Sequence, residues 1–372
     1  MTDHDGAPAR VAGDVTVVVV TWEQRDLVLA CLESLARQTV AHRVLVVDNA
    51  STDGTAERVA EHFPHARILR QTSNLGFAGG VSAALDVVET RFVALLNNDA
   101  QADPRWLEAS LAALAEPSVV AVTAKLLLAE RGASAEPGSR QAAAVDDPTL
   151  NAAAVDDPTL NAAAVNAATI NNAGVILLGS GYGADRGLGS PDDERFASPV
   201  EVFGFSGGAV VMRTLAVKAV GGFDADYFMY YEDTDLSWRL RLAGWHIVYA
   251  PDAVVHHLHA ASSDSQSEMF AFHNERNRLL TLLRDAPLGF AASKIARFAL
   301  TTASLAGKPL IGRAVPDDQV FRSVLRLRVL AAVLSWLPVT LRKRHRVPTR
   351  RRRSAVFHEW AGVTERPLNE AG

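Results

Sequence analysis

The sequence predicts an α/β fold in which a mostly parallel, Rossmann-like sheet is flanked by helices and followed by a helical C-terminal extension. Short apolar runs typical of buried strands alternate with segments whose apolar residues recur at helical spacing. After this alternation, the stretch 290–341 is apolar at helical spacing throughout. Apolar residues make up 48% of the 372 residues and charged residues 21%, which is the composition of a globular chain with a substantial core.

The elements follow in order along the chain. The first strand, VTVVVVT, is followed by a helix with Leu27, Cys31 and Leu35 on one face. A single cysteine excludes a disulfide framework, and Cys31 is expected to be buried filler. Strands are predicted at 15–21, 43–48, 66–70, 92–96, 119–124, 174–178, 200–205, 246–250 and 253–257, and an apolar run continues to Met212. Helices are predicted at 26–38, 81–89, 104–115 and 268–284, with a further helix over Leu236 to Ala243 that Gly244 ends.

The predicted organisation is one large α/β domain with appended segments. Residues 1–13 are expected to be a disordered tail without the features of a signal peptide, so the cytoplasm is the default compartment. Residues 14–285 form the domain, which carries a mobile insertion at 130–168 where AAAVDDPTLN (142–151) recurs unchanged at 152–161. This repeat is too short and too few in number for a solenoid, and no function is assigned to it.

Two interpretations of the C-terminal region remain open. The longest uncharged run in the extension 286–345 is Val329 to Leu341, thirteen residues, whereas a spanning helix needs about twenty. An amphipathic helix followed by the basic cluster RKRHRVPTRRRR (342–353) would suit an anionic membrane surface at the inner face of the plasma membrane. Alternatively, the extension is an ordinary core helix and 346–372 is a solvated basic tail.

The stretch FVALLNNDA carries the first candidate site. A buried strand ends there in Asn97, Asn98 and Asp99, and ligands of open α/β sheets bind at the mouths of central strands. A carboxylate at that place can hold a hard cation, which in turn can hold a diphosphate. The alternative is a polar turn, since asparagine and aspartate are common turn residues.

Two loops indicate a nucleotide. Asp48 at the mouth of the second strand can accept a hydrogen bond from an imide N–H, and Ser51 and Asp53 share its loop, although Asp53 could simply cap a helix. The segment Asn74-Leu75-Gly76-Phe77-Ala78-Gly79-Gly80 combines glycines with a helix start, which favours phosphate. It follows the third strand and not the first, which argues against a dinucleotide oxidoreductase.

The segment Glu232-Asp233-Thr234-Asp235 provides a candidate general base. A carboxylate at a helix start beside bulky aromatic residues can deprotonate an acceptor hydroxyl, and Asp233 is the proposed base. The alternatives are that Asp233 is an N-cap and that Phe228 and Tyr230 belong to the core.

Six motifs in this order and spacing resemble family 2 glycosyltransferases, in particular the bacterial rhamnosyltransferase-like branch that builds cell-wall and surface polysaccharides. They are VVVVTW, VLVVDNASTDGT, NLGFAGG, LLNNDA, SGGAVVMR and GGFDADYFMYYEDTDLSWRLRLAGW, and the likeness covers roughly 15–284. The resemblance implies a GT-A fold and transfer of a sugar, with rhamnose as the first guess, from a nucleotide-diphosphate donor with inversion. It also implies a divalent cation (Mg²⁺ or Mn²⁺), a lipid-linked or polysaccharide acceptor and no nucleic-acid partner.

The resemblance also assigns residues to roles. Asp233 would be the catalytic base, and Asp99 with His257 would bind the metal, although His256 and His259 compete for the histidine role. The nucleotide sugar would be bound by Thr21, Glu23, Asp48, Asn49, Ser51, Asp53, Asn74, Gly76, Phe77, Asn97 and Asn98. The donor sugar and acceptor would contact Ser206, Gly207, Gly208, Tyr231, Glu232 and Trp238.

The sequence departs from the family pattern at two places. Asn97-Asn98-Asp99 replaces the usual paired acidic motif, and Trp22-Glu23 stands where Tyr-Asn is common. Two rival functions are a nucleotidyltransferase, which should carry a glycine- and arginine-rich loop after the first strand, and a non-catalytic glycan-binding or assembly protein. A glycosidase would leave the nucleotide and diphosphate loops unexplained.

Overall fold

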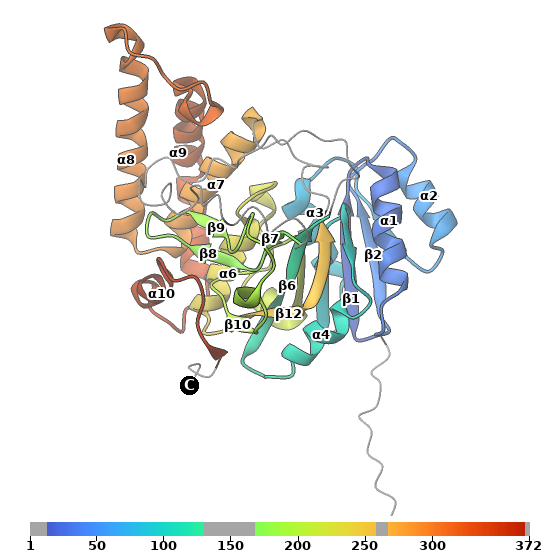
Figure 1. Cartoon of the computed structure of the whole chain (residues 1–372). Helices are drawn as coiled ribbons and strands as arrows, with labels where there is room; N and C mark the ends of the chain where they lie inside the picture. Colours follow the sequence, from blue (N-terminus) through green and yellow to red (C-terminus); the bar gives the residue numbers. More distant parts are fainter. Residues whose placement is uncertain (1–12, 130–167, 258–266, 369–372) are drawn as a thin grey trace, which may run out of the picture.

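The computed structural model describes residues 13–129, 168–257 and 267–368. The predicted N-terminal tail and the predicted repeat-containing insertion fall almost entirely outside these residues. Within them the chain forms an α/β body with a helical hairpin at one side (Figure 1).

One ten-stranded sheet organises the described residues, in the order β10-β12-β6-β11-β4-β1-β2-β3, with β5 paired to β12 and β7 to β6. Strands β3, β2, β1 and β4 run parallel, and β12 is parallel to β6. Strand β11 is antiparallel to both β4 and β6, so the six long parallel strands enclose one reversed strand. The main strands are β1 (Val15–Thr21), β2 (Arg43–Asp48), β3 (Arg67–Arg70), β4 (Phe92–Leu96), β6 (Val119–Leu128), β11 (Ala209–Arg213) and β12 (His246–His257). The predicted mostly parallel α/β sheet is therefore confirmed.

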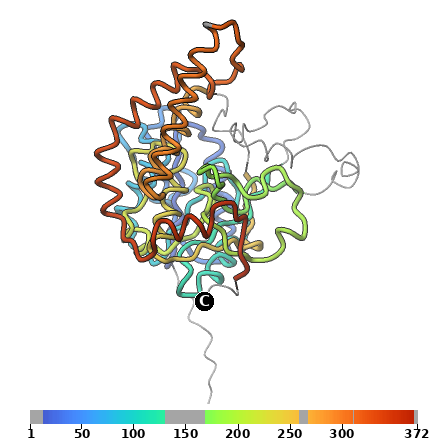
Figure 2. Tube along the Cα trace, turned by 90° about the vertical axis from the view of Figure 1, so that its left-hand side faces the viewer, coloured from blue at the N-terminus to red at the C-terminus, as the bar shows by residue number. Residues whose placement is uncertain are grey.

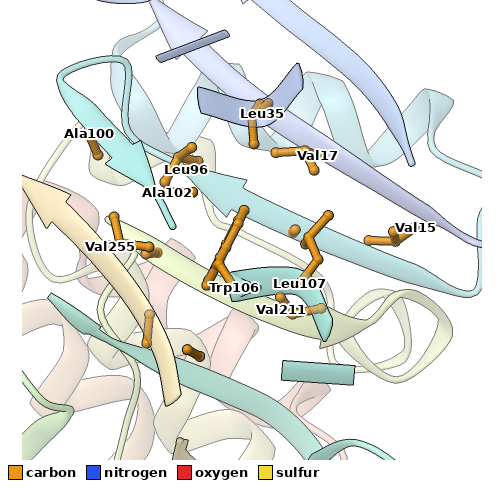
Figure 3. Packing of buried hydrophobic residues seen from close by; sticks show 14 of the residues in the cluster. Val15, Val17, Leu35, Leu96, Ala100, Ala102, Trp106, Leu107, Val211 and Val255 are labelled. Atoms are coloured by element: carbon orange, nitrogen blue, oxygen red, sulfur yellow. The ribbon is translucent and has the colours of Figure 1, made fainter. Parts of the chain in front are cut away.

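Two hydrophobic clusters cover the two faces of the sheet. Alternate residues of β1 point to opposite sides, so Val15, Val17 and Val19 join one cluster and Val18 the other. The first cluster packs the sheet against α1 (Arg25–Ala36), α2 (Thr55–His62) and α4 (Trp106–Ala113), and the second against α3 (Gly76–Val87), α5 (Thr214–Ala219) and α6 (Glu232–Leu242). In the first cluster Trp106 and Leu107 of α4 lie among sheet residues such as Leu96 and Val211 (Figure 3).

The remaining elements are short or belong to the C-terminal part. The short strands are β5 (Ala100–Ala102), β7 (Ile170–Asn172), β8 (Val175–Leu177), β9 (Gly183–Asp185) and β10 (Val200–Glu201). The 3-10 turns are η2 (Glu194–Phe196), η3 (Ala225–Tyr227), η4 (Pro309–Ile311) and η5 (Gln319–Phe321). The C-terminal helices are α7 (Glu268–Asp285), α8 (Leu288–Gly307), α9 (Ser323–Arg346) and α10 (Arg353–Trp360).

Several predicted boundaries shift. The helix expected at 81–89 already begins at Gly76, because the glycine-rich loop itself is helical. The two strands expected at 246–250 and 253–257 are one strand, β12, whose register shifts between Ala250 and Val254. The strand expected at 174–178 is β8, which forms a separate two-stranded sheet with β9 and single bridges to Gly204 and Ala361. Gly244 follows α6 with φ of 87°, as its predicted role in ending that helix requires.

The segment expected to be a solvated basic tail is largely folded. Trp360 in α10 is fully buried and packs with Phe203 and Phe357 in a third hydrophobic cluster shared by α6 to α10. Arg366 exchanges two backbone hydrogen bonds with Glu201 of β10. Part of the basic cluster makes hydrogen bonds within the fold. Arg344 donates to the carbonyl of Ala286 at the end of α7, 2.8 Å away. Only some of these basic side chains are therefore free to meet a partner.

Helix α9 is the one described helix that is long and apolar enough to cross a membrane by length and composition. Its most apolar 18-residue window has a mean hydropathy of 1.7, and 28% of that window is buried within the protein. The apolar part of the helix is thus longer than the thirteen-residue uncharged run, and it includes Arg326 and Arg328. In the fold, Arg326 lies over the ring of Phe298 in α8, 3.9 Å from its centre. The helix is thus built into the protein along one side.

Candidate functional site

The carboxyl ends of β1, β2 and β4 bring the first group of predicted residues together. Thr21 and Asp48 are register partners at the ends of β1 and β2. The Asn98 side-chain amide donates to Oγ1 of Thr21 over 3.2 Å, which ties the end of β4 to that of β1. Asp48 is 3% exposed and its Oδ1 accepts from the backbone N–H of Ser51 at 3.1 Å. Because parallel strands all end at this edge, residues far apart in sequence share one surface.

The loop after β1 and the loop after β2 are held to each other. The Glu23 N–H donates to Oγ of Ser51 at 2.8 Å, and Oε1 of Glu23 accepts from the N–H of Thr52 at 3.0 Å. Asp53 accepts from the Thr55 N–H at 3.0 Å and from the Arg25 N–H at 3.2 Å. Asp53 therefore accepts hydrogen bonds from N–H groups at the starts of α2 and α1, although the N-cap residue of α2 is Gly54, and these hydrogen bonds outweigh burial to lower the pKa of Asp53.

The glycine-rich start of α3 packs tightly against the aromatic loop before α6. Gly76 has φ of 69°, its N–H donates to Oδ1 of Asn74 at 2.8 Å, and its carbonyl accepts from Nδ2 of Asn49 at 3.0 Å. A Cβ at Gly76 would lie 2.3 Å from the carbonyl oxygen of Phe228, so only glycine fits there. Phe77 packs edge-on against Phe223, with the ring centres 6.3 Å apart. These contacts fix the distance between the start of α3 and the aromatic loop, which lie far apart in the sequence.

Asp99 and His257 meet, as the predicted metal pair requires. Nε2 of His257 lies 3.0 Å from Oδ1 of Asp99, and Asp99 is 2% exposed. The pairing of β5 with β12 sets this approach, because Ala100 is the register partner of His257. Neither ring nitrogen of His257 makes a hydrogen bond of good geometry to a described residue. A buried carboxylate beside an imidazole with uncommitted nitrogens fits a divalent cation.

The described residues offer no third protein ligand at this place, since they contain no group of three or more His, Cys, Asp or Glu able to hold a metal. A cation bound to Asp99 and His257 would therefore take its other ligands from a diphosphate and from water, as Mg²⁺ commonly does. His256, one of the competing histidines, pairs instead with Asp103 at 3.5 Å. His259 lies outside the described residues.

Asp233 reaches the same edge of the sheet through the segment 206–208. The Asn97 N–H donates to the Gly208 carbonyl at 2.9 Å, and the Gly207 N–H donates to Oδ2 of Asp233 at 3.0 Å. Oδ1 of Asp233 accepts from the Thr234 N–H at 2.6 Å. Burial raises the pKa of Asp233, although these donors oppose the rise. A carboxyl group with a raised pKa at a helix start is suited to accept a proton near neutral pH.

Two neighbours of Asp233 share its environment. Glu232 is 7% exposed, its Oε2 has no hydrogen-bond partner among the described residues, and burial raises its pKa well above the usual range. The Tyr231 hydroxyl accepts from the Gly183 N–H at 3.1 Å, which ties strand β9 to the start of α6. Both residues therefore flank Asp233 in the chain at the start of α6, and their contact with the donor sugar or acceptor stays a prediction.

Trp238 lies in the core and away from the site. Its predicted contact with a sugar is therefore wrong. The Trp238 side chain is 1% exposed, packs edge-on against Phe203 with the ring centres 5.5 Å apart, and stacks on Phe357. Each helical residue turns about 100°, so a position five residues after Asp233 points about 140° away from it. Trp238 belongs to the core that joins α6 to the C-terminal helices.

Asp185 is a site residue that the sequence analysis missed. Burial and the charge of Asp233 raise its pKa to about 6, whereas a hydrogen bond from Asn172 at 2.6 Å and the charge of His257 act in the opposite direction. Asp185 therefore lies close to both Asp233 and the His257 side of the metal pair. The stretch GSGYGADRG carries no motif that would single it out, and its position depends on β9 being tied to α6.

Asn277 was also missed, and it holds the loop that precedes Asp233. Phe228, Tyr230 and Tyr231 all have positive φ (65°, 68° and 70°), a conformation that costs side-chain-bearing residues about 1–3 kcal/mol each. Asn277 of α7 is fully buried and donates to three carbonyls of this stretch, those of Tyr227, Met229 and Tyr230, at 2.7–3.0 Å. The strained aromatic loop is thus held by the Asn277 amide of a distant helix, together with Arg276, which donates to the carbonyls of Asp226 and Tyr227 at 2.9 Å.

Replacing Asn277 with alanine is expected to lower both stability and turnover. The carbonyls of Met229 and Tyr230 would lose their side-chain donor and that of Tyr227 would lose one of its donors, which predicts a loss of about 2–4 kcal/mol in the free energy of unfolding. If Asn277 positions Asp233, the lower activity of the folded variant should be found in kcat more than in KM. Denaturant unfolding and steady-state kinetics at a temperature where the variant is folded test this, with Asn274→Ala on the same helix as control. An unchanged kcat in N277A would exclude a positioning role.

A cavity of about 570 Å³ lies at the opposite edge of the sheet, near the amino ends of the strands. It is lined by residues including His42, Arg43, His65 and Arg67, and it contains none of the predicted site residues. It therefore plays no part in the arrangement around Asp99 and Asp233.

Comparison with known proteins agrees with this geometry. Residues 16–140 match the family model described as glycosyl transferase family 2, and residues 193–279 match glycosyltransferase-like family 2. The N-acetylglucosaminyl-diphospho-decaprenol L-rhamnosyltransferase of Mycobacterium tuberculosis is 30% identical over 272 residues, covering 69% of this chain and 80% of that protein. The rhamnosyltransferase WbbL of Escherichia coli K12 is 42% identical over 62 residues, 17% of this chain and 23% of that protein.

Among solved structures, GalNAc-T7 with UDP, GalNAc and Mn²⁺ aligns with a TM-score of 0.54 at 11% identity, covering 87% of this chain and 56% of that one. At this identity the likeness concerns the fold alone. The two matched family regions contain, respectively, Asp99 and Asp233, the two carboxylates that the sheet edge brings into one neighbourhood.

Proposed function

Because this chain belongs to glycosyltransferase family 2, with the GT-A type of fold expected from its motifs, we propose that it transfers rhamnose from a nucleotide-diphosphate donor to a lipid-linked acceptor. The observation that carries the proposal is the pairing of Asp99 with His257 on the sheet edge that also carries Asp233. The choice of sugar and acceptor is supported by the mycobacterial L-rhamnosyltransferase, whose name specifies a decaprenol-linked acceptor. The product would serve cell-wall or surface polysaccharide synthesis.

The donor would lie over the ends of β1, β2 and β4. Asp48 is well placed to accept from the imide N–H of a thymine or uracil ring, and deoxythymidine-diphosphate rhamnose is the first candidate donor. Asp99 and His257 would hold Mg²⁺ or Mn²⁺ there. When bound, such a cation neutralises charge on the departing diphosphate. The hydrogen bond from Asn98 to Thr21 joins the loops at the ends of β4 and β1. It would keep the part of this surface that holds the diphosphate aligned with the part that holds the nucleotide.

The acceptor hydroxyl would approach Asp233. As its oxygen forms the new bond to the anomeric carbon, the bond from that carbon to the diphosphate oxygen breaks and the hydroxyl proton passes to Asp233. The configuration at the anomeric carbon is inverted, because one displacement occurs on the face opposite the leaving group. The raised pKa of Asp233 suits this role, since a base with an ordinary aspartate pKa would accept the proton less readily.

The reaction would take place at the cytoplasmic face of the plasma membrane, where a lipid-linked acceptor is available. The test is transfer by the full-length protein from deoxythymidine-diphosphate rhamnose to a polyprenyl-diphosphate N-acetylglucosamine, with Mn²⁺ or Mg²⁺ present. Donors carrying galactofuranose or hexoses form the comparison panel. The proposal predicts a disaccharide product with inverted anomeric configuration by NMR. Nucleotide binding without transfer to any acceptor would instead favour a binding or assembly protein.

A further inference from the structure

The outward face of α9 is an apolar stripe that nothing in the described structure covers. It consists of Val324, Leu327, Ala331, Leu334 and Pro338, spaced three and four residues apart, and is called here the α9 stripe. Val324 is 70% exposed, Leu327 56% and Leu334 66%. The opposite face of the helix, with Leu325, Val329 and Val333, is buried, and Val329 and Val333 belong to the third hydrophobic cluster. The helix is therefore apolar on two sides, of which one faces solvent.

The charged side chains of α8 and α9 themselves are all basic, although Glu268 of α7 pairs with Arg328 and Asp224 and Asp226 pair with Lys343. Neither α8 nor α9 contains an aspartate or a glutamate. The exposed side chains of Arg342, His345 and Arg346 follow the stripe at the C-terminal end of α9. An apolar face bordered by basic side chains is the pattern of a helix that lies in the interface of an anionic bilayer.

The position of the hairpin suits such contact. Helices α8 and α9 run side by side and extend beyond the α/β body in both views (Figure 1, Figure 2). Between them, near the tip of the hairpin, Ile311 is 68% exposed, and Leu300 of α8 is 72% exposed. A protruding apolar element can reach into a surface that the body of the protein does not enter.

Contacts along α9 argue that the helix lies on a membrane and does not span it. Lys343 reaches Oδ1 of Asp224 at 2.7 Å, and Arg326 donates to Oγ1 of Thr302 at 3.0 Å. A spanning position would require these polar contacts to the α/β body and to α8 to break. Pairing of two copies through their stripes would bring basic rows together with no acidic residue on α9 to offset them.

We propose that the α9 stripe docks this protein on an anionic lipid bilayer. The stripe sits in the interface while Arg342 and Arg346 contact lipid phosphates. The link to catalysis rests on the proposed function: Asn277 on α7, against which α9 packs, holds the loop before Asp233, so docking would present the acceptor side of the site to a lipid-linked substrate.

Co-sedimentation of the full-length protein with vesicles tests the proposal, using phosphatidylcholine alone and phosphatidylcholine mixed with phosphatidylglycerol. Wild type is expected to bind the mixed vesicles and to be released by salt. The double variant Leu327→Ser/Leu334→Ser should bind at least about tenfold more weakly, because two apolar side chains no longer enter the bilayer. Leu215→Ser, which removes a 79% exposed leucine on α5, is the matched control and should bind like wild type.

Three outcomes would overturn the docking surface: no binding of wild type to anionic vesicles, equal binding of the stripe variant, or a wild-type dimer that the stripe variant converts to monomer. A water-soluble acceptor analogue separates this inference from the proposed function. The stripe variant should use that analogue as well as wild type does. Vesicle binding by a protein that transfers no sugar would contradict the proposed function and leave the docking surface standing.

Discussion

Replacing Asp233 with asparagine is expected to lower turnover by about a hundredfold or more, because the acceptor hydroxyl loses its base. The two side chains have nearly the same shape, and the Gly207 and Thr234 N–H groups that contact Asp233 come from the backbone, so they remain in place. Steady-state kinetics measure the loss, and a thermal shift with the nucleoside diphosphate should show that the donor still binds. Asp252→Asn, an exposed carboxylate on β12, is the matched control.

The pH dependence provides a second readout for Asp233. A general base acts only when deprotonated, so kcat should fall as the pH drops through the pKa of the group. Since burial raises that pKa, the fall should begin at a higher pH than an ordinary aspartate would give. Glu232 and Asp185 lie nearby and also have raised pKa values. The fall of kcat at low pH therefore reports the titration of these carboxyl groups together with that of Asp233. In D233N the fall of kcat at low pH should shift or shrink, and an unchanged pH profile there would assign the base to another residue.

Replacing Asp99 with asparagine should produce the other large effect. A neutral amide binds a hard cation far more weakly than a carboxylate, so turnover is expected to fall roughly a hundredfold and to recover in part at high Mn²⁺. Chelation should abolish wild-type turnover, and Mn²⁺ or Mg²⁺ should restore it. Titration of activity with Mn²⁺ measures the shift in metal requirement for each protein.

The histidine pair provides a control for the metal site. His257→Gln should raise the Mn²⁺ requirement, because it removes the imidazole that lies 3.0 Å from Asp99. His256→Gln alters the adjacent histidine, which pairs with Asp103, and should leave that requirement unchanged. If wild type, H257Q and D99N required the same Mn²⁺ concentration, Asp99 and His257 would not be the metal site.

The sequence predicted the parts of the site that follow directly from a strand. Buried apolar runs ending in Asp48 or in Asn97-Asn98-Asp99 define strand mouths, and the parallel sheet brings these mouths to one edge. The sequence could not show that β11 runs against its neighbours, because the apolar pattern of a buried strand has no direction. Yet it is the turn before β11 that joins Gly207 to Asp233.

The parts that escaped prediction depend on contacts between distant segments. Asn277 is one polar residue in a long helix, and its role becomes visible only when three carbonyls of the aromatic loop are seen around it. Trp238 was assigned to the site because it stands inside a recognised motif, whereas helical geometry turns it into the core. Trp360 lies in a short helix among basic residues, where composition indicates a solvated tail and packing buries it.

Anomalous diffraction from crystals grown with Mn²⁺ and deoxythymidine diphosphate tests the central arrangement most directly. We expect one strong manganese peak bound by Asp99, His257 and the diphosphate, with the nucleotide over Asp48 and the Asp233 carboxylate facing the open side of the terminal phosphate. A manganese ion bound elsewhere, or a diphosphate lying away from the edge that Asp99 and Asp233 share, would contradict the account.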